Sequence, residues 1–265
     1  MTLTDTYTLN NGLTIPKIGF GTWQSKDGDE AYQAVKTALE AGYRHIDTAA
    51  AYHNEASVGQ AIADSGIARE ELFVTTKLWG VGTTEDATKA LDESLEKLGL
   101  DAVDLYLIHW PNPKAFRPNY EARNAAVWKA MEAAVKAGKA RSIGVSNFHK
   151  RHLDKLLKTA EIVPAVNQIM VNPSDQQREI VSYNVKHNIL TEAYSPLGTG
   201  KIFSIEALQT IANQYNKTVA QVVLRWSLHK GYLPLPKSVT PERIRENADI
   251  FDFNVSVEDI AFIDG

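Results

Sequence analysis

Short apolar runs alternate with amphipathic segments along most of the chain. Eight runs rich in β-branched and aromatic residues occur at 18–20, 45–46, 73–76, 103–108, 142–145, 165–167, 189–193 and 233–235. Apolar residues three and four positions apart predict helices at 30–41, 54–65, 84–98, 123–137, 150–159, 175–187, 205–215 and 218–229. Eight strand–helix alternations favour parallel strands joined by right-handed crossovers. We therefore predict an α/β fold, a (β/α)8 TIM barrel.

A β-hairpin is expected ahead of the barrel, at residues 7–15. Two short strand-like runs there flank Asn11-Gly12, a dipeptide that supplies the positive φ angles of a tight turn. Farther along, no low-complexity linker or shift in composition divides the sequence. Because α/β barrels of this length are single units, we expect residues 1–265 to form one domain.

Composition excludes several classes of protein. Apolar residues make up 44% and charged residues 23%, as in ordinary soluble globular proteins. The net charge of −4 argues against a nucleic-acid partner. The absence of cysteine excludes disulfides, thiolate metal sites and cysteine nucleophiles. No apolar run is long enough to span a membrane and no signal peptide is evident, so we expect a cytoplasmic protein.

Polar residues follow the apolar runs, where the active site of a TIM barrel lies. They are Asp47, Lys77, His109, Ser146, Asn147, Asn167, Gln168, Tyr194, Ser195, Lys237 and Ser238. Each one alone could be a helix cap, a turn residue or a satisfied core residue. Together they predict a polar rim, since Lys77 needs a partner near the barrel mouth and Asp47 follows the neighbouring strand.

At these residues the sequence resembles the aldo-keto reductase superfamily, and most of all its small bacterial enzymes related to 2,5-diketo-D-gluconate reductase. The matching motifs are at 42–50, 52, 54–55, 75–79, 104–111, 142–148, 235–238, 243 and 246–247, in the order expected for the family. The resemblance implies an NADPH-dependent carbonyl reductase that transfers hydride from nicotinamide to small aldehydes or ketones. No metal is required.

The resemblance also implies a catalytic tetrad of Asp47, Tyr52, Lys77 and His109. Tyr52 would protonate the carbonyl oxygen, and His109 would donate a hydrogen bond that orients the carbonyl. A free phenol titrates near pH 10 and is a weak acid at neutrality. An ammonium about 4 Å away, at an effective dielectric near 20, stabilises phenolate by roughly 4 kcal/mol before desolvation opposes it. We therefore expect Lys77, kept charged by Asp47, to make Tyr52 unusually acidic.

Cofactor contacts follow from the same resemblance. Gly21, Thr22, Trp23 and Asp47 lie at the nicotinamide end, Tyr194 stacks on the ring, and Ser146, Asn147 and Gln168 hold the carboxamide. The pyrophosphate lies against Ser195, Leu197 and Gly198, the 2′-phosphate against Lys237, Ser238, Val239 and Arg243, and adenine against Glu246 and Asn247. Arginine binds a phosphate dianion in a bidentate manner, which predicts a preference for NADPH over NADH. Thr240, where close relatives often carry arginine, is expected to loosen this contact.

Aromatic walls around one polar spot predict the substrate pocket. Its expected residues are Trp23, Tyr52, His53, Trp79, His109 and Trp110. Aromatic aldehydes, glyoxals, α-diketones and keto-sugars all suit such a pocket. His53, where many relatives have a small residue, either adds a titrating group or faces solvent. Family members usually continue past position 265 with a tail over the substrate, so specificity stays open and a longer natural chain is expected.

Two other functions remain open from sequence. A lyase could form a Schiff base through Lys77 or Lys237, although a neighbouring Asp47 would keep Lys77 protonated. A non-enzymatic NADPH sensor is the second alternative, which the intact tetrad disfavours. The family resemblance favours a monomer.

Overall fold

The computed structural model describes residues 2–265, and its main sheet is parallel and follows chain order from β3 to β10. The strands are β3 (Phe20–Gly21), β4 (His45–Asp47), β5 (Phe73–Leu78), β6 (Val103–Ile108), β7 (Ala140–Ser146), β8 (Val166–Met170), β9 (Leu190–Tyr194) and β10 (Leu233–Leu235). The backbone N–H groups of Gly19 and Gly21 donate to the carbonyl oxygens of Pro234 and Pro236 at 3.1 and 3.0 Å. These bonds join the first strand to the last, and the predicted (β/α)8 barrel is confirmed.

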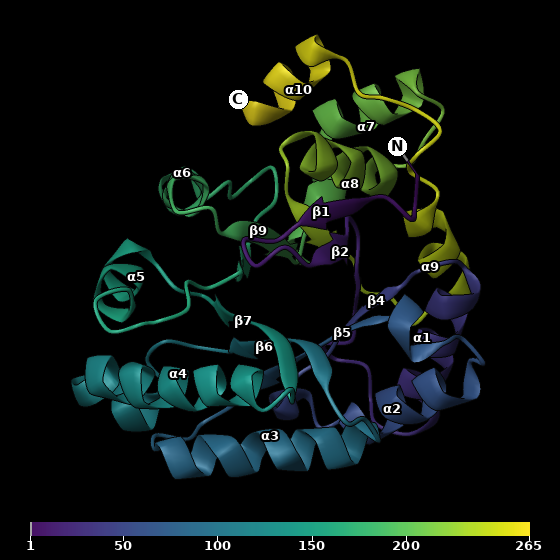
Figure 1. Cartoon of the computed structure of the whole chain (residues 1–265). Helices are drawn as coiled ribbons and strands as arrows, with labels where there is room; N and C mark the ends of the chain where they lie inside the picture. Colours follow the sequence, from purple (N-terminus) through teal and green to yellow (C-terminus); the bar gives the residue numbers. More distant parts are fainter. Residues whose placement is uncertain (1) are drawn as a thin grey trace.

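Helices cover the outside of the barrel. They are α1 (Asp29–Glu40), α2 (Glu55–Asp64), α3 (Thr84–Leu98), α4 (Tyr120–Lys136), α5 (Lys150–Leu156), α6 (Arg178–Lys186), α7 (Glu206–Gln214), α8 (Val219–His229), α9 (Pro241–Ala248) and α10 (Val257–Asp264). Figure 1 shows α3 and α4 side by side outside β5–β7, with α7, α8 and α10 grouped on the opposite side. Within residues 2–265, no helix combines the length and apolar character that crossing a membrane requires.

Local sequence sets the ends of several helices. The hydroxyl of Thr83 accepts from the Asp86 N–H at 3.0 Å and begins α3, and Thr218 begins α8 by accepting from Gln221 N–H at 3.2 Å. Gly99 ends α3 in the left-handed region, with a φ of 66° that glycine adopts at little cost. The strand–helix periodicity read from the sequence is therefore reinforced by caps at these boundaries.

The N-terminal hairpin, β1 (Thr6–Thr8) and β2 (Thr14–Pro16), closes the amino-terminal end of the barrel. Leu9 N–H donates to the Leu13 oxygen at 2.8 Å, so the loop has three residues, and Gly12 has a φ of 86°. The prediction of positive φ at both Asn11 and Gly12 was wrong, because in a three-residue loop the glycine alone forms the bulge. Asn11 instead donates its side-chain amide to the Ser142 hydroxyl at the start of β7.

The barrel interior changes character along its axis. Its part next to the N-terminal hairpin is apolar, and Leu105, Leu107, Val166 and Leu233 pack there against Ile15. Toward the carboxyl ends of the strands the inward side chains become polar and charged while remaining buried. Buried polar groups need partners, so this upper layer is built as a hydrogen-bonded network.

Candidate active site

A cavity of about 1030 Å³ opens at the carboxyl ends of the strands. This volume lies at the upper end of ligand sites, which range from about 300 to 1,000 Å³. It brings together these residues expected from sequence: Gly21, Trp23, Asp47, Tyr52, Trp79, His109, Trp110, Ser146, Asn147, Gln168, Tyr194, Ser195, Leu197, Lys237, Ser238, Arg243, Glu246 and Asn247. Residues more than 200 positions apart in the sequence therefore line one cavity, because the carboxyl ends of the parallel strands lie at the same end of the barrel.

Lys77 is the centre of the network below this cavity. Its side chain, 0% exposed, donates from Nζ to Asp47 Oδ1 at 2.5 Å, to the Thr48 carbonyl oxygen at 2.9 Å and to the Tyr52 hydroxyl oxygen at 3.3 Å. Three acceptors thus match the three hydrogens of an ammonium. Burial lowers the pKa of Lys77, but the Asp47 carboxylate and the Tyr52 oxygen raise it more, so the group stays charged.

Tyr52 ends a short 3-10 helix, η1 (Ala50–Tyr52), between β4 and α2. Asn54 fixes this segment: its side chain accepts from the Thr48 hydroxyl at 2.8 Å and donates to the Thr22 and Ser25 carbonyl oxygens, both at 3.0 Å. Because the Tyr52 oxygen accepts from Lys77, the hydroxyl hydrogen is left to donate toward the cavity that Tyr52 lines.

The expectation of an unusually acidic Tyr52 is not met in this structure. Burial raises the pKa of the Tyr52 hydroxyl, and the neighbouring Lys77 ammonium lowers it by less. The phenol is therefore protonated at neutral pH. The ammonium beside it stabilises the phenolate that would remain after the proton is donated.

His109 completes the polar floor from the end of β6. Its ring meets those of Tyr52 and Trp79 edge to face, at centroid distances of 5.6 and 5.3 Å. Burial, and then the charge of Lys77, lower its pKa to about 3, so the imidazole is neutral. Its Nδ1 is buried without a hydrogen-bond partner among residues 2–265, which favours the tautomer carrying hydrogen on Nε2. His109 can then donate from Nε2 to a ligand.

A second hydrogen-bonded group joins the ends of β6 to β9. Asn147, in the left-handed region with a φ of 61°, donates to the His109 carbonyl oxygen at 3.0 Å and accepts from the Tyr194 hydroxyl at 2.7 Å. The Ser146 hydroxyl donates to the Gln168 carbonyl oxygen at 2.8 Å. These contacts fix Tyr194, Asn147 and Ser146 on one side of the cavity.

Glu192 was missed from sequence. It lies on β9, 0% exposed, and its Oε2 accepts from Gln168 Nε2 at 2.7 Å; the same Nε2 donates to Asp47 Oδ2 at 2.8 Å. The signal was a single carboxyl residue in a strand without other charges, two positions before Tyr194 and therefore on the same inward face.

Five residues expected in the site lie outside the cavity lining: Thr22, His53, Lys77, Gly198 and Val239. Lys77 lies directly below it and reaches the cavity through its hydrogen bond to Tyr52. Thr22 is buried and supports Asp47, donating from its hydroxyl to the Asp47 carbonyl oxygen at 3.0 Å. His53 is exposed, and its φ of 56° explains why a small residue suits this position; its place in the substrate pocket stays a prediction. The lining residues that sequence did not suggest are Gln24, Ala51, Pro196, Thr199, Gly200, Phe203, Ala220, Leu235 and Pro236.

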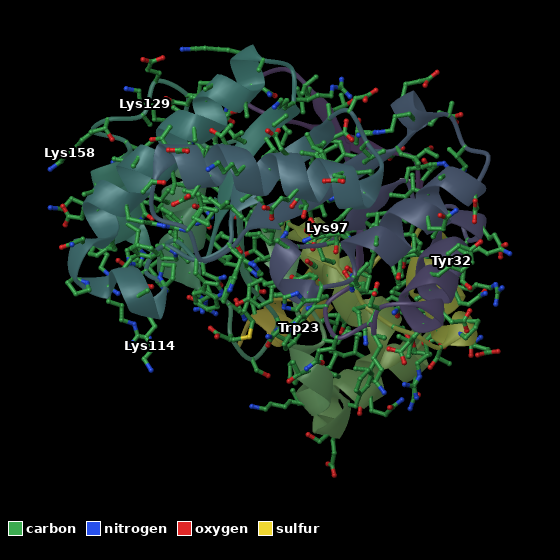
Figure 2. The ribbon with its side chains drawn as sticks, turned by 90° about the horizontal axis from the view of Figure 1, so that it is seen from below. Trp23, Tyr32, Lys97, Lys114, Lys129 and Lys158 are labelled. Atoms are coloured by element: carbon green, nitrogen blue, oxygen red, sulfur yellow. The ribbon has the colours of Figure 1, made fainter. Side chains whose placement is uncertain are left out.

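The cavity lining combines exposed aromatic residues with cations. Trp23, Trp79 and Trp110 are 47%, 48% and 42% exposed and form an aromatic rim. Lys237 and Arg243 provide positive charge: Arg243 lies on α9, and Lys237 Nζ donates to the Gln24 carbonyl oxygen at 3.4 Å, next to Trp23 in the chain. Trp23 lies near the middle of the view in Figure 2, whereas Lys129 and Lys158 extend from its edge.

At the floor of the cavity the Tyr52 hydroxyl lies next to the Lys77 ammonium, an arrangement that suits an enzyme donating a proton to its substrate. Residues 17–265 match the profile of the Aldo/keto reductase family. The chain is 48% identical to the glyoxal reductase of Bacillus subtilis (strain 168), over 99% of this chain and 92% of the relative. It is 46% identical to the methylglyoxal reductase DkgA of Yersinia pestis, over 99% and 93% of the two chains.

A solved structure gives the same result. The Bombyx mori aldo-keto reductase, determined in complex with NADP, superimposes with a TM-score of 0.90 at 40% identity, covering 100% of this chain and 93% of that one. The chain belongs to the aldo/keto reductase family, and its fold and family are confirmed. The branch related to 2,5-diketo-D-gluconate reductase stays a prediction.

Proposed function

We propose that the protein reduces small aldehydes and α-dicarbonyl compounds with NADPH, with Tyr52 as the general acid. The observation that carries this proposal is the hydrogen bond from Lys77 Nζ to the Tyr52 oxygen. It leaves the phenolic hydrogen for the cavity and puts a positive charge next to the oxygen that would become negative.

The cavity suits a dinucleotide in its volume and in the chemistry of its lining. Ser146, Asn147 and Gln168 supply polar groups, and Lys237 and Arg243 supply positive charge. A cationic pair suits the 2′-phosphate that distinguishes NADPH from NADH. When bound, NADPH supplies the hydride.

The chain's own part in the reaction is to hold the carbonyl and move one proton. His109 donates a hydrogen bond to the carbonyl oxygen, and Tyr52 gives that oxygen its hydroxyl hydrogen. Lys77 stabilises the phenolate, and Asp47 keeps Lys77 charged and directed.

A compact, planar substrate suits this site. The aromatic rim offers flat apolar walls, and the polar groups that reach it are few. Glyoxal and methylglyoxal, which two relatives are named for reducing, have this character. A Schiff base through Lys77 is disfavoured, since a charged Lys77 held by Asp47 has no free lone pair for a carbonyl carbon.

The experiment is the loss of NADPH absorbance in the near ultraviolet with glyoxal, methylglyoxal, aromatic aldehydes and keto-sugars. We expect turnover with the first two. Tyr52→Phe should lower kcat by about 10²–10⁴-fold, the usual contribution of general acid catalysis, while NADPH still binds.

The matched control is Tyr32→Phe, which removes a tyrosine hydroxyl from α1 that donates to Asp64 at the surface. Its kcat should equal that of the wild type. Turnover that survives in Tyr52→Phe would contradict the acid role. NADPH binding with no turnover on any carbonyl compound would point to a sensor instead.

A further inference from the structure

Gln168 lies at the cavity floor with its amide nitrogen already occupied. Nε2 donates one hydrogen to Asp47 Oδ2 at 2.8 Å and the other to Glu192 Oε2 at 2.7 Å. An amide has two N–H donors, so none remains for a ligand. The carbonyl oxygen is the part of the Gln168 amide that can meet one.

The carboxyl group of Glu192 lies in an unusual place. It is fully buried on β9, and its Oε1 has no hydrogen-bond partner among residues 2–265. Burying a carboxyl group in a barrel interior costs free energy, and an apolar side chain would fill the same space at lower cost. Within residues 2–265 its side chain makes one hydrogen bond, to the Gln168 amide next to the Asp47–Lys77 pair.

We propose that Glu192 is a positioning residue that locks the Gln168 amide, so that its carbonyl oxygen accepts a hydrogen bond from the carboxamide NH2 of the nicotinamide. This role rests on the proposed function. Rotation of the amide would place its oxygen against the Asp47 carboxylate, and it would leave Glu192 Oε2 without the N–H that it accepts.

The charge of Glu192 is set by its surroundings. Burial, and then Asp47 on β4, raise its pKa to about 8, while the Gln168 hydrogen bond and Lys77 on β5 oppose them. The residue paired with it on β10 is Leu233, which carries no charge, and His45 below Asp47 is neutral because burial lowers its pKa to about 3. Glu192 is therefore neutral at pH 7 and gains a negative charge above pH 8.

The test measures ligand affinity in the absence of substrate. Glu192→Leu removes the anchor, and we expect about 3–10-fold weaker NADPH binding, as for one lost hydrogen bond. The probe 2′-phospho-ADP-ribose, which lacks the nicotinamide, should bind Glu192→Leu and wild type equally. An equal loss for both ligands, or no loss for NADPH, would overturn the role of Glu192.

Glu192→Gln keeps an acceptor oxygen and removes the ionisation, and it covers the case in which Glu192→Leu does not fold. In the wild type, a new negative charge near the ring should favour NADP, whose nicotinamide is cationic, over NADPH. The ratio of the two affinities should therefore move several-fold toward NADP as pH rises through 8. Glu192→Gln should show no such change, and the same change in Glu192→Gln would count against the proposal.

The matched control is Glu132→Gln on α4. Glu132 is also buried, but it accepts from the backbone N–H groups of Glu161 and Ile162, away from the cavity. Glu132→Gln should leave the affinities for NADPH and NADP, and the pH dependence of their ratio, unchanged. Failure of the wild type to bind either ligand would overturn the proposed function, and the role of Glu192 with it.

Discussion

Two buried aspartates lie at opposite ends of the barrel, and they use the same chemistry differently. Asp47 ends β4 and pairs with Lys77, and both side chains are at most 4% exposed. Asp104, near the start of β6, accepts from Arg69 at 2.7 Å and Arg141 at 2.9 Å, whose side chains are 35% and 51% exposed. The Asp47–Lys77 pair is therefore buried away from solvent, whereas the arginines that bind Asp104 are partly exposed to it.

The difference in solvent contact explains what each pair can do. At the amino-terminal end, Asp104 also accepts from the Val74 N–H at 2.8 Å, and Arg69 donates to the Leu72 and Ala102 carbonyl oxygens. These bonds tie neighbouring strands together, and water screens the charges. At the other end solvent does not screen Lys77, so its charge acts on Tyr52 and His109, offset at Tyr52 in part by Asp47.

Lys77→Met should have the largest effect. It leaves the Asp47 carboxylate buried without its cation, which typically costs about 3–5 kcal/mol of stability, and it removes the positive charge beside Tyr52. Denaturant unfolding and steady-state kinetics measure the two effects. The double variant Asp47→Asn with Lys77→Met should recover much of the stability and none of the activity; recovery of activity would show that the charge is dispensable.

Glu192→Gln should change the dependence of stability on pH. The pKa of Glu192 is raised to about 8 from a usual value near 4.5, so its stabilisation is complete below pH 4.5 and is lost as pH rises through 8. Relative to the wild type, the free energy of unfolding of the variant should therefore rise by up to a few kcal/mol between pH 5 and 9. Thermal unfolding across this range measures the difference. The same pH dependence in both proteins would show that burial does not raise the pKa of Glu192.

Asp104→Asn should destabilise the protein without touching catalysis. Removing a charged acceptor from two arginines and one backbone N–H is expected to cost about 1–3 kcal/mol. Because the site is remote from the cavity, kcat and KM at 25 °C should stay at wild-type values. A drop in kcat with folding intact would mean that the two ends of the barrel are coupled.

Arg243→Ala should lower the preference for NADPH over NADH by about 10-fold, since a charge-assisted hydrogen bond contributes about 1.5–3 kcal/mol and this side chain is exposed. The ratio of kcat/KM for the two cofactors is the measurement. Arg245→Ala on the same helix, outside the cavity lining, is the control. An unchanged preference in Arg243→Ala would show that this arginine does not bind the 2′-phosphate.

Salt should have the smallest effect, and it should separate the two pairs. Raising ionic strength from 0.05 to 1 M shortens the Debye length to about 3 Å and should weaken the exposed Arg141–Asp104 contact by less than about 1 kcal/mol. The destabilisation caused by Arg141→Ala should shrink accordingly. The effect of Lys77→Met should not change with salt.

The sequence by itself determined the barrel. Alternating apolar runs and amphipathic segments encode strands and helices locally, and eight repeats of one unit admit few topologies. The strand-end positions of Asp47, Lys77 and Gln168 followed from that pattern, because parallel strands end on one face. Family motifs added Tyr52, which ends a single 3-10 turn and carries no signal of periodicity.

Tertiary structure decided what those residues experience. Burial depends on packing by distant segments, so no local pattern could show that desolvation outweighs Lys77 at Tyr52. The turn at His53 places that side chain in solvent although its neighbour lines the cavity. Glu192 gained its place in the network only when closure of the barrel brought β9 and β8 to the Asp47–Lys77 pair.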